Sequence, residues 1–261
     1  MSTYRERRVM HPPIVNDPAV PLIAAGGLSK RYGRSQAVTG LSLAVHGGEV
    51  CALLGPNGAG KTSTMRMLAG LSRPDEGSVH LLGEPVRLGA PVLRRAGVLI
   101  DGPAFVPHLT GLRNLRLLWS ATGRDWPPPA LDDALDLAGL GGAVDRRVRG
   151  YSMGMKQRLM LAQALMRAPA VLILDEPANG LDPAEVRALR QRLRALASEG
   201  AAVLVSSHQL AEVQQLATHA VIMNRGTLVT AGPLDRLLGG AQSLEEAFLA
   251  MTEGGDEHAA R

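Results

Sequence analysis

The feature that most constrains this chain is the segment GPNGAGKTS at residues 55–63. It fits the pattern G-x-x-x-x-G-K-[ST] with Gly55, Gly60, Lys61 and Thr62, and it follows an apolar run and opens a helical pattern. In a chain of this composition the pattern is expected by chance roughly 0.003 times. Its glycines let backbone N–H groups surround phosphate oxygens at a helix N-terminus. The segment therefore predicts a phosphate-binding loop, with Lys61 on the β- and γ-phosphates and the Thr62 hydroxyl on Mg²⁺.

A second candidate site is the acidic pair in VLILDEP, residues 171–177. The apolar run before Asp175 is typical of a strand buried on both faces. A strand that emerges beside the phosphate-binding loop would place Asp175 to hold Mg²⁺, directly or through water. Glu176 would then polarise an attacking water. The alternative, an ordinary strand end with two solvated acids, stays open on this pattern alone.

The remaining pattern indicates an α/β chain whose βα alternation is interrupted by a helix-rich stretch. Strands are predicted within 21–54 and at 78–82, 170–174 and 201–207, with a hairpin at 219–232. Helices are predicted at 61–71, 111–121 after a Thr110 cap, 127–140, 153–167 and 184–200, with a short one near the C-terminus.

Composition excludes several classes of protein. The 261 residues include one cysteine, which rules out an intramolecular disulfide framework and any multi-cysteine zinc site. The longest aliphatic stretches run only a few residues, far short of the roughly 20 that a membrane-spanning helix needs. The formal net charge of +4 permits contact with nucleic acid or acidic lipid without demanding it. Prolines interrupt the first 20 residues, which we interpret as a flexible tail.

The order of the motifs resembles that of ATP-binding-cassette (ABC) ATPases over about residues 20–250. Five pieces match in sequence order: GPNGAGKTS (Walker A), YSMGMKQR at 151–158 (signature), VLILDEP at 171–177 (Walker B), NGLDP at 179–183 (D-loop) and SSHQ at 206–209 (switch histidine). Five motifs in the right order are far more specific than any one of them.

The resemblance implies a P-loop NTPase fold, with a RecA-like core, an antiparallel β subdomain and an inserted α-helical subdomain. On this division, 1–20 is the tail, 21–86 and 168–238 form the catalytic core with the β subdomain, 87–167 is the helical subdomain, and 239–261 is a C-terminal helix and tail. It also implies ATP and Mg²⁺ as cofactors.

The resemblance further assigns roles to individual residues. The catalytic set is Glu176, His208 and Lys61, with His208 on the γ-phosphate. The Mg²⁺ set is Thr62, Asp175 and Asp101. The ATP-binding set is Tyr32, Gly55, Asn57, Gly58, Ala59, Gly60, Lys61, Thr62, Ser63, Ser152, Gly154 and Asp182. Tyr32 would stack on adenine, Ser152 and Gly154 would contact ATP held by a second subunit, and Asn179 and Asp182 would line the dimer interface.

Alternative interpretations of four features remain. Tyr32 would otherwise be a half-buried strand tyrosine, His208 a core or helix-capping histidine, and Asp101 a plain loop residue. Phe105, Val106, Pro107 and Leu109 form either a docking patch for a membrane partner or a locally packed cluster.

Two departures from the family pattern point to one branch. The usual signature LSGGQ reads YSMGM here, so the Ser and second Gly remain while the first Gly and the Gln do not. The loop that usually carries Gln has Asp101, whose shorter, charged side chain favours contact with Mg²⁺ through water. Both departures resemble the bacterial antibiotic- and drug-export branch, the bacitracin-type group.

The resemblance therefore implies the ATP-hydrolysing subunit of an exporter of an antibiotic-like compound, drug or lipid. Its partners would be a second ATPase subunit, identical or paired, and a separate membrane permease, with no nucleic acid. It would lie in the cytoplasm, on the inner face of the cell membrane. The alternatives are a soluble ABC-type ATPase acting on DNA or the ribosome, an import ATPase, and a P-loop kinase or GTPase. This last alternative explains neither YSMGM nor SSHQ.

Overall fold

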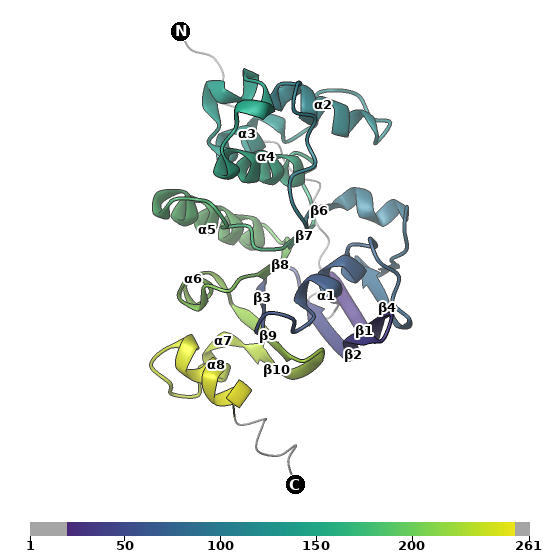
Figure 1. The fold of residues 1–261 in the computed structure, drawn as a ribbon, viewed down its shortest axis with the longest axis vertical. Coiled ribbons are helices and arrows are strands. Elements are labelled where there is room, and N and C mark those ends of the chain that lie inside the picture. Colours follow the sequence, from purple (N-terminus) through teal and green to yellow (C-terminus); the bar gives the residue numbers. More distant parts are fainter. Residues whose placement is uncertain (1–19, 254–261) are drawn as a thin grey trace.

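A computed structural model describes residues 20–253 (Figure 1). The expected tail at 1–20, except Val20, and the acidic end at 254–261 lie outside the described residues. The strands are β1 (Ile23–Tyr32), β2 (Ser35–Val45), β3 (Val50–Leu54), β4 (Glu76–Leu81), β5 (Glu84–Pro85), β6 (Ala96–Leu99), β7 (Val171–Leu174), β8 (Ala202–Ser206), β9 (His219–Asn224) and β10 (Thr227–Pro233). The helices are α1 (Lys61–Leu68), α2 (Gly111–Ser120), α3 (Leu131–Ala138), α4 (Met153–Leu165), α5 (Pro183–Ser198), α6 (Leu210–Leu216), α7 (Leu234–Leu238) and α8 (Leu244–Glu253).

A six-stranded sheet in the order β10-β9-β3-β8-β7-β6 forms the centre of the molecule. Its strands from β9 to β6 run parallel, and β10 is antiparallel at one edge. Because parallel strands end at the same edge, the loops after β3, β7 and β8 meet there. The strand that leads to Asp175, β7, is not the direct neighbour of β3, since β8 lies between them.

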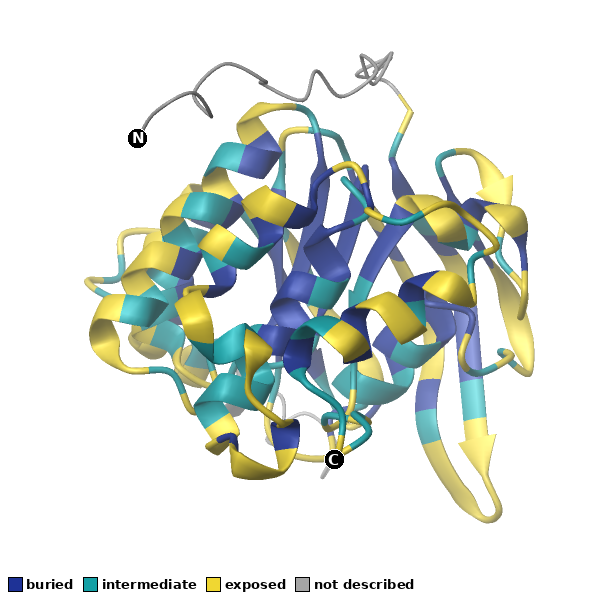
Figure 2. Cartoon of the chain, turned by 90° about the horizontal axis from the view of Figure 1, so that it is seen from above, coloured by how far each residue is buried: buried dark blue, intermediate teal, exposed yellow. Residues whose placement is uncertain are grey.

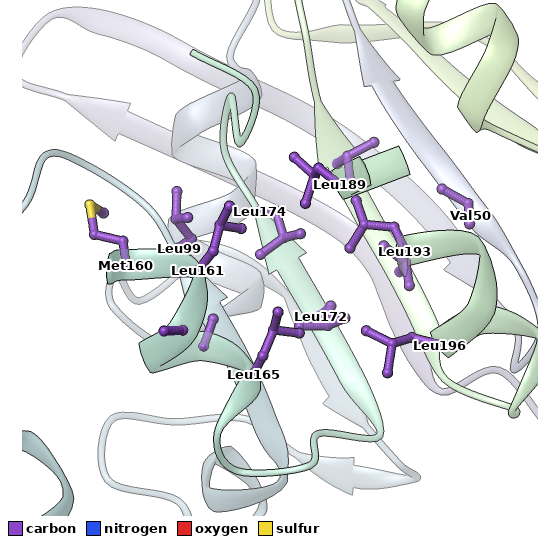
Figure 3. Close-up of a cluster of buried hydrophobic side chains, with 14 of the residues drawn as sticks. Val50, Leu99, Met160, Leu161, Leu165, Leu172, Leu174, Leu189, Leu193 and Leu196 are labelled. Atoms are coloured by element: carbon purple, nitrogen blue, oxygen red, sulfur yellow. The ribbon is translucent and has the colours of Figure 1, made fainter. Parts of the chain in front are cut away.

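The inner strands β3, β7 and β8 are buried on both faces, so they have no polar side (Figure 2). Alternate residues point to opposite faces and enter two separate hydrophobic clusters. One cluster takes Val50, Leu172 and Leu174 and packs against α4 and α5 (Figure 3). The other takes Leu53 and Ile173 and packs against α1 and the second sheet. The continuous apolar runs in the sequence are explained by this two-sided burial.

The second sheet has four antiparallel strands in the order β2-β1-β4-β5. It lies beside α1 (Figure 1) and shares a hydrophobic cluster with that helix. Its contact with the loop before α1 is close, because a Cβ atom on Gly60 would lie 2.4 Å from the carbonyl oxygen of Ala37 in β2. The β2 strand therefore forms one wall beside the phosphate-binding loop.

Helices α2, α3 and α4 gather at the end of the molecule opposite α7 and α8 (Figure 1). The Thr110 side chain accepts a hydrogen bond from the Arg113 amide, which confirms the predicted cap of α2. One segment differs from expectation: residues 96–99, inside the stretch 87–167 expected to be helical, form β6 and pair with β7. The strand AGVL contains a glycine and directly follows Arg94 and Arg95, so it lacks the continuous apolar run that marks β7. The structure also contains α6 and α7, which the sequence pattern did not reveal.

Candidate nucleotide-binding site

The phosphate-binding loop connects β3 to α1 and requires its glycines. Gly58 and Gly60 have φ angles of 81° and 99°, in the left-handed region that other residues rarely adopt. Gly55 is needed for close approach, because its Cβ would lie 2.4 Å from the Met223 carbonyl oxygen. The backbone of β9 thus supports the loop from below, and the N-terminus of α1 is left open for an anion.

A pocket of about 460 Å³ lies over this loop. It is lined by Ser35, Gln36, Ala37, Asn57, Gly58, Ala59, Gly60, Lys61, Thr62, Ser63, Asp175 and Glu176. Nine of these residues, those from Asn57 to Ser63 with Asp175 and Glu176, were predicted from sequence as site residues. The other three come from the start of β2.

The Lys61 side chain is hydrogen-bonded to the backbone of its own phosphate-binding loop. Its Nζ atom donates to the Gly55 carbonyl oxygen at 2.6 Å and to that of Pro56 at 3.2 Å. Partial burial lowers the pKa of Lys61, and the carboxylates of Glu176 and Asp175 oppose this shift. The ammonium group therefore lies within the field of both acids.

The Walker A and Walker B motifs meet through two side chains. The Thr62 hydroxyl donates to Asp175 Oδ2 at 2.9 Å. A hydroxyl and a carboxylate at this separation supply the hard oxygen ligands that Mg²⁺ prefers. Within residues 20–253 there is no group of three or more His, Cys, Asp or Glu side chains suited to a metal ion. These two side chains thus fit an ion that also binds phosphate oxygens and water.

Glu176 combines an uncommon backbone conformation with a side-chain contact to His208. Its φ angle is 49°, an uncommon value for a residue with a side chain. Its Oε2 atom lies 2.8 Å from Nδ1 of His208, so the loop after β7 and the loop after β8 are joined at this point. The predicted pair of Glu176 and His208 is therefore brought together, with His208 largely exposed.

Two residues that were not predicted from the sequence hold the segment of Asp175 and Glu176 in place. The buried Ser206 hydroxyl donates to Asp175 Oδ1 at 2.5 Å and accepts from the Glu176 amide at 2.9 Å. The Gln157 side chain donates to the carbonyl oxygens of Glu176 and Pro177 at 3.2 and 3.3 Å. A serine that ends a buried strand was the available signal for Ser206. Gln157, within the segment YSMGMKQR, had no signal of its own.

Tyr32 ends β1 and is 45% exposed. Hydrogen bonding to Ser72 lowers the pKa of its phenol, and burial partly opposes this, while Ser63 of the phosphate-binding loop also lowers it. The Lys30 ammonium lies 5.6 Å from the ring centroid. An exposed ring beside the phosphate-binding loop is available for stacking with a nucleobase.

Asp101 is not among the residues that line the pocket over the phosphate-binding loop. Its carboxylate forms an ion pair with Arg66, with Arg66 Nε 3.3 Å from Oδ2 and a second contact from Nη2 to Oδ1. In the loop that follows, Phe105 packs against the core cluster, whereas Pro107 is exposed. The docking patch expected at 105–109 is thus partly committed to local packing.

Signature and D-loop residues also lie outside the pocket lining. Ser152 caps α4 by accepting from the Met155 amide at 3.2 Å, and Asp182 caps α5 in a capping box with Glu185. The two segments touch, since a Cβ on Gly154 would lie 2.5 Å from the Gly180 carbonyl oxygen. Ser152 and Asp182 are exposed, so both are accessible to another molecule.

Comparison with known proteins identifies relatives of this arrangement. The ABC transporter family model matches residues 38–179. The chain is 38% identical to the bacitracin transport ATP-binding protein BcrA of Bacillus licheniformis over 218 residues, which are 83% of this chain and 71% of that protein. It is 36% identical to the Nod factor export ATP-binding protein I of Ralstonia nicotianae, over 88% of this chain and 73% of that protein.

Solved structures share the fold. The structure of an ATP-binding subunit of an ABC transporter is 29% identical, with a TM-score of 0.80 over 88% of this chain and 99% of that one. A dimeric bacterial ABC transporter cassette is 23% identical, with a TM-score of 0.74 over 81% of this chain and 98% of that one. These likenesses confirm the predicted α/β P-loop NTPase fold.

Proposed function

The chain belongs to the ATP-binding subunits of ABC transporters, and from this premise we propose which of its residues bind and hydrolyse ATP, and with what partners. ATP hydrolysis is the activity of the family. The observation that carries the proposal is the convergence of the phosphate-binding loop, Asp175, Glu176 and His208 at one edge of the central sheet. The ATP phosphates would contact the backbone amides of residues 57–63 and the Lys61 ammonium, and the adenine ring would stack on Tyr32.

Glu176 is proposed as the general base. His208, 2.8 Å from Oε2, orients its carboxylate, and Ser206 holds the backbone of the same residue through the Glu176 amide. Lys61 counters the charge of the terminal phosphates. Mg²⁺, when bound to Thr62 and Asp175, would supply charge neutralisation on those phosphates. The protein's part is to position a water for attack and to accept its proton at Glu176.

A second copy is proposed to complete the site. Ser152 and Gly154 lie outside the pocket lining of their own chain, and Ser152 and Asp182 are exposed. A head-to-tail dimer would bring these segments against the ATP of the opposite chain. A solved cassette with a similar fold is dimeric, which supports the pairing of two copies.

The test uses Glu176→Gln, with Glu245→Gln on the exposed face of α8 as the matched control. We expect Glu176→Gln to bind ATP as the parent does, while kcat falls by about 100-fold or more. With slow hydrolysis, light scattering with ATP and Mg²⁺ should show a doubled molar mass. Near-parental turnover would contradict the role of Glu176, and a monomer with saturating ATP would contradict the dimer.

Export of an antibiotic-like compound, drug or lipid is proposed as the transported process. Relatives named for bacitracin transport and for Nod factor export support this direction over import, and over action on DNA or the ribosome. Within residues 20–253 the structure contains no helix long and apolar enough to span a bilayer. We propose that a separate permease holds the chain at the cytoplasmic face of the membrane, because the relatives are named for transport and export.

The partner proposal is tested by purifying the tagged full chain from detergent-solubilised membranes of its host. A copurifying integral membrane protein, released when the 105–109 loop is altered by Pro107→Asp, supports the proposal. Recovery of the chain only from the soluble fraction, with no membrane protein attached, contradicts it.

A further inference from the structure

The partner of Asp101 is the least expected contact near the site. Arg66 approaches its carboxylate with two nitrogens, Nε and Nη2, one to each oxygen. Such a two-pronged pair fixes direction as well as distance, which a lysine at this position would not do. Hydrogen bonding to Asp101 is also the main cause of the raised pKa of Arg66.

Arg66 occupies a connecting position on α1. It lies four residues after Thr62, so both side chains share one face of the helix, about 6 Å apart along its axis. Arg66 also interacts with the Tyr32 phenol, which contributes to the same raised pKa. Arg66 thus contacts the proposed base-binding side of the site and the loop of Asp101 at the same time.

The loop after Asp101 is fixed at its two ends by different devices. At the start, Asp101 has a φ angle of 68° and is held by Arg66. At the end, the buried Asn114 side chain accepts from the Val106 amide at 2.7 Å and donates to the Val106 and Thr110 carbonyl oxygens. The second anchor is buried, whereas Arg66 and Asp101 are 40% and 50% exposed. The Arg66–Asp101 ion pair is therefore the anchor that is accessible to water and can break.

We propose that Arg66 is a positioning residue that anchors Asp101 and the loop 101–105 to α1, so that nucleotide binding controls this loop through one ion pair. The inference rests on the proposed function for the identity of the nucleotide. Asp101 then acts as the partner of Arg66 and not as a contact of Mg²⁺. Because the loop leads directly to the segment 105–109, the ion pair ties the nucleotide site to the proposed docking region.

Hydrogen exchange measured by mass spectrometry tests the anchor without depending on hydrolysis. In the nucleotide-free protein, Arg66→Gln and Asp101→Asn should each speed exchange of residues 101–105 by about threefold, and the double variant should add nothing further. The swapped pair Arg66→Asp with Asp101→Arg should restore slow exchange. A non-hydrolysable ATP analogue with Mg²⁺ should change exchange of this loop in the parent and not in Arg66→Gln. Arg187→Gln, on an exposed part of α5, is the control.

Steady-state ATPase activity separates the anchor from a metal contact. The anchor predicts that Arg66→Gln and Asp101→Asn lower kcat by similar factors and leave the Mg²⁺ concentration for half-maximal activity unchanged. A raised Mg²⁺ requirement for Asp101→Asn alone would overturn the inference, as would additive effects on exchange or failure of the swap. If the unmodified protein did not hydrolyse ATP, the proposed function would be refuted. The exchange rates in the nucleotide-free protein would still show whether the Arg66–Asp101 ion pair anchors the loop.

Discussion

At the scale of single residues, the site depends on polar side chains that come from distant parts of the chain. Ser206 follows Asp175 by 31 positions, yet its hydroxyl bonds to that carboxylate and to the next amide. Full burial makes such bonds directional and costly to leave unmade. The buried Ser206 hydroxyl therefore holds the Asp175 carboxylate and the Glu176 backbone next to each other.

Asn114, in the first turn of α2, has a comparable role for the loop before that helix. It is 1% exposed, and its three hydrogen bonds to the backbone close the segment from Val106 to Thr110. Asn114→Ala should lower the free energy of unfolding by about 2 kcal/mol or more, because buried backbone groups lose their partners. Urea unfolding measures this, with exposed Arg113→Ala as the control. Equal stability of the two variants would contradict the role of Asn114.

At the scale of elements, the N-terminus of α4 and the turn before α5 are in backbone contact. This contact exists only because Gly154 has no side chain, since a Cβ would lie 2.5 Å from the Gly180 carbonyl oxygen. The signature segment and the D-loop are thus in direct contact within a single chain, before any second copy binds. A nearby glycine, Gly150, has open space where a Cβ would be and serves as a comparison.

Gly154→Ala should displace the D-loop from α4 and reduce ATPase activity at least about tenfold, while Gly150→Ala should have activity close to the parent. The physical reason is that backbone atoms on both sides of the contact have little room to move. Initial rates at saturating ATP measure the effect, and circular dichroism checks that both variants fold. Similar activities for the two variants would show that the close approach has no functional weight.

At the scale of the whole molecule, one sheet separates two hydrophobic clusters and holds the phosphate-binding loop and the loops after β7 and β8 at its edge. Leu193 of α5 is completely buried in the cluster beside Leu172 and Leu196 (Figure 3). Removal of such a side chain leaves a cavity that a close-packed interior does not fill. The stability of the site therefore depends on residues far from it.

Leu193→Ala should lower the free energy of unfolding by about 2–5 kcal/mol. Leu88→Ala, at a position that is 83% exposed, should change it by less than about 0.5 kcal/mol. Urea midpoints with unchanged m-values measure both. Were Leu193→Ala as stable as Leu88→Ala, the cluster between α5 and the sheet would not be packed as described.

Sequence reasoning succeeded where a motif is contiguous. The loop at 55–63 must lie between a strand and a helix, and the runs around Val171 and Val203 can be satisfied only by two-sided burial. Caps such as Thr110 are similarly local, because the cap and the amide that it accepts from are three residues apart. β6 was not predicted, because Gly97 interrupts its apolar residues, whereas β7, of the same length, is a continuous apolar run.

By itself, the sequence determined the phosphate-binding loop, the acids of the second motif and the parallel α/β fold that carries them, because each depends on neighbours along the chain. Only the tertiary structure decided that β8 lies between β3 and β7, that Ser206 holds Asp175, and that Asp101 pairs with Arg66. These contacts join residues more than 30 positions apart. Their choice depends on strand order and on which side chains reach the same edge of the sheet, and no local pattern encodes either.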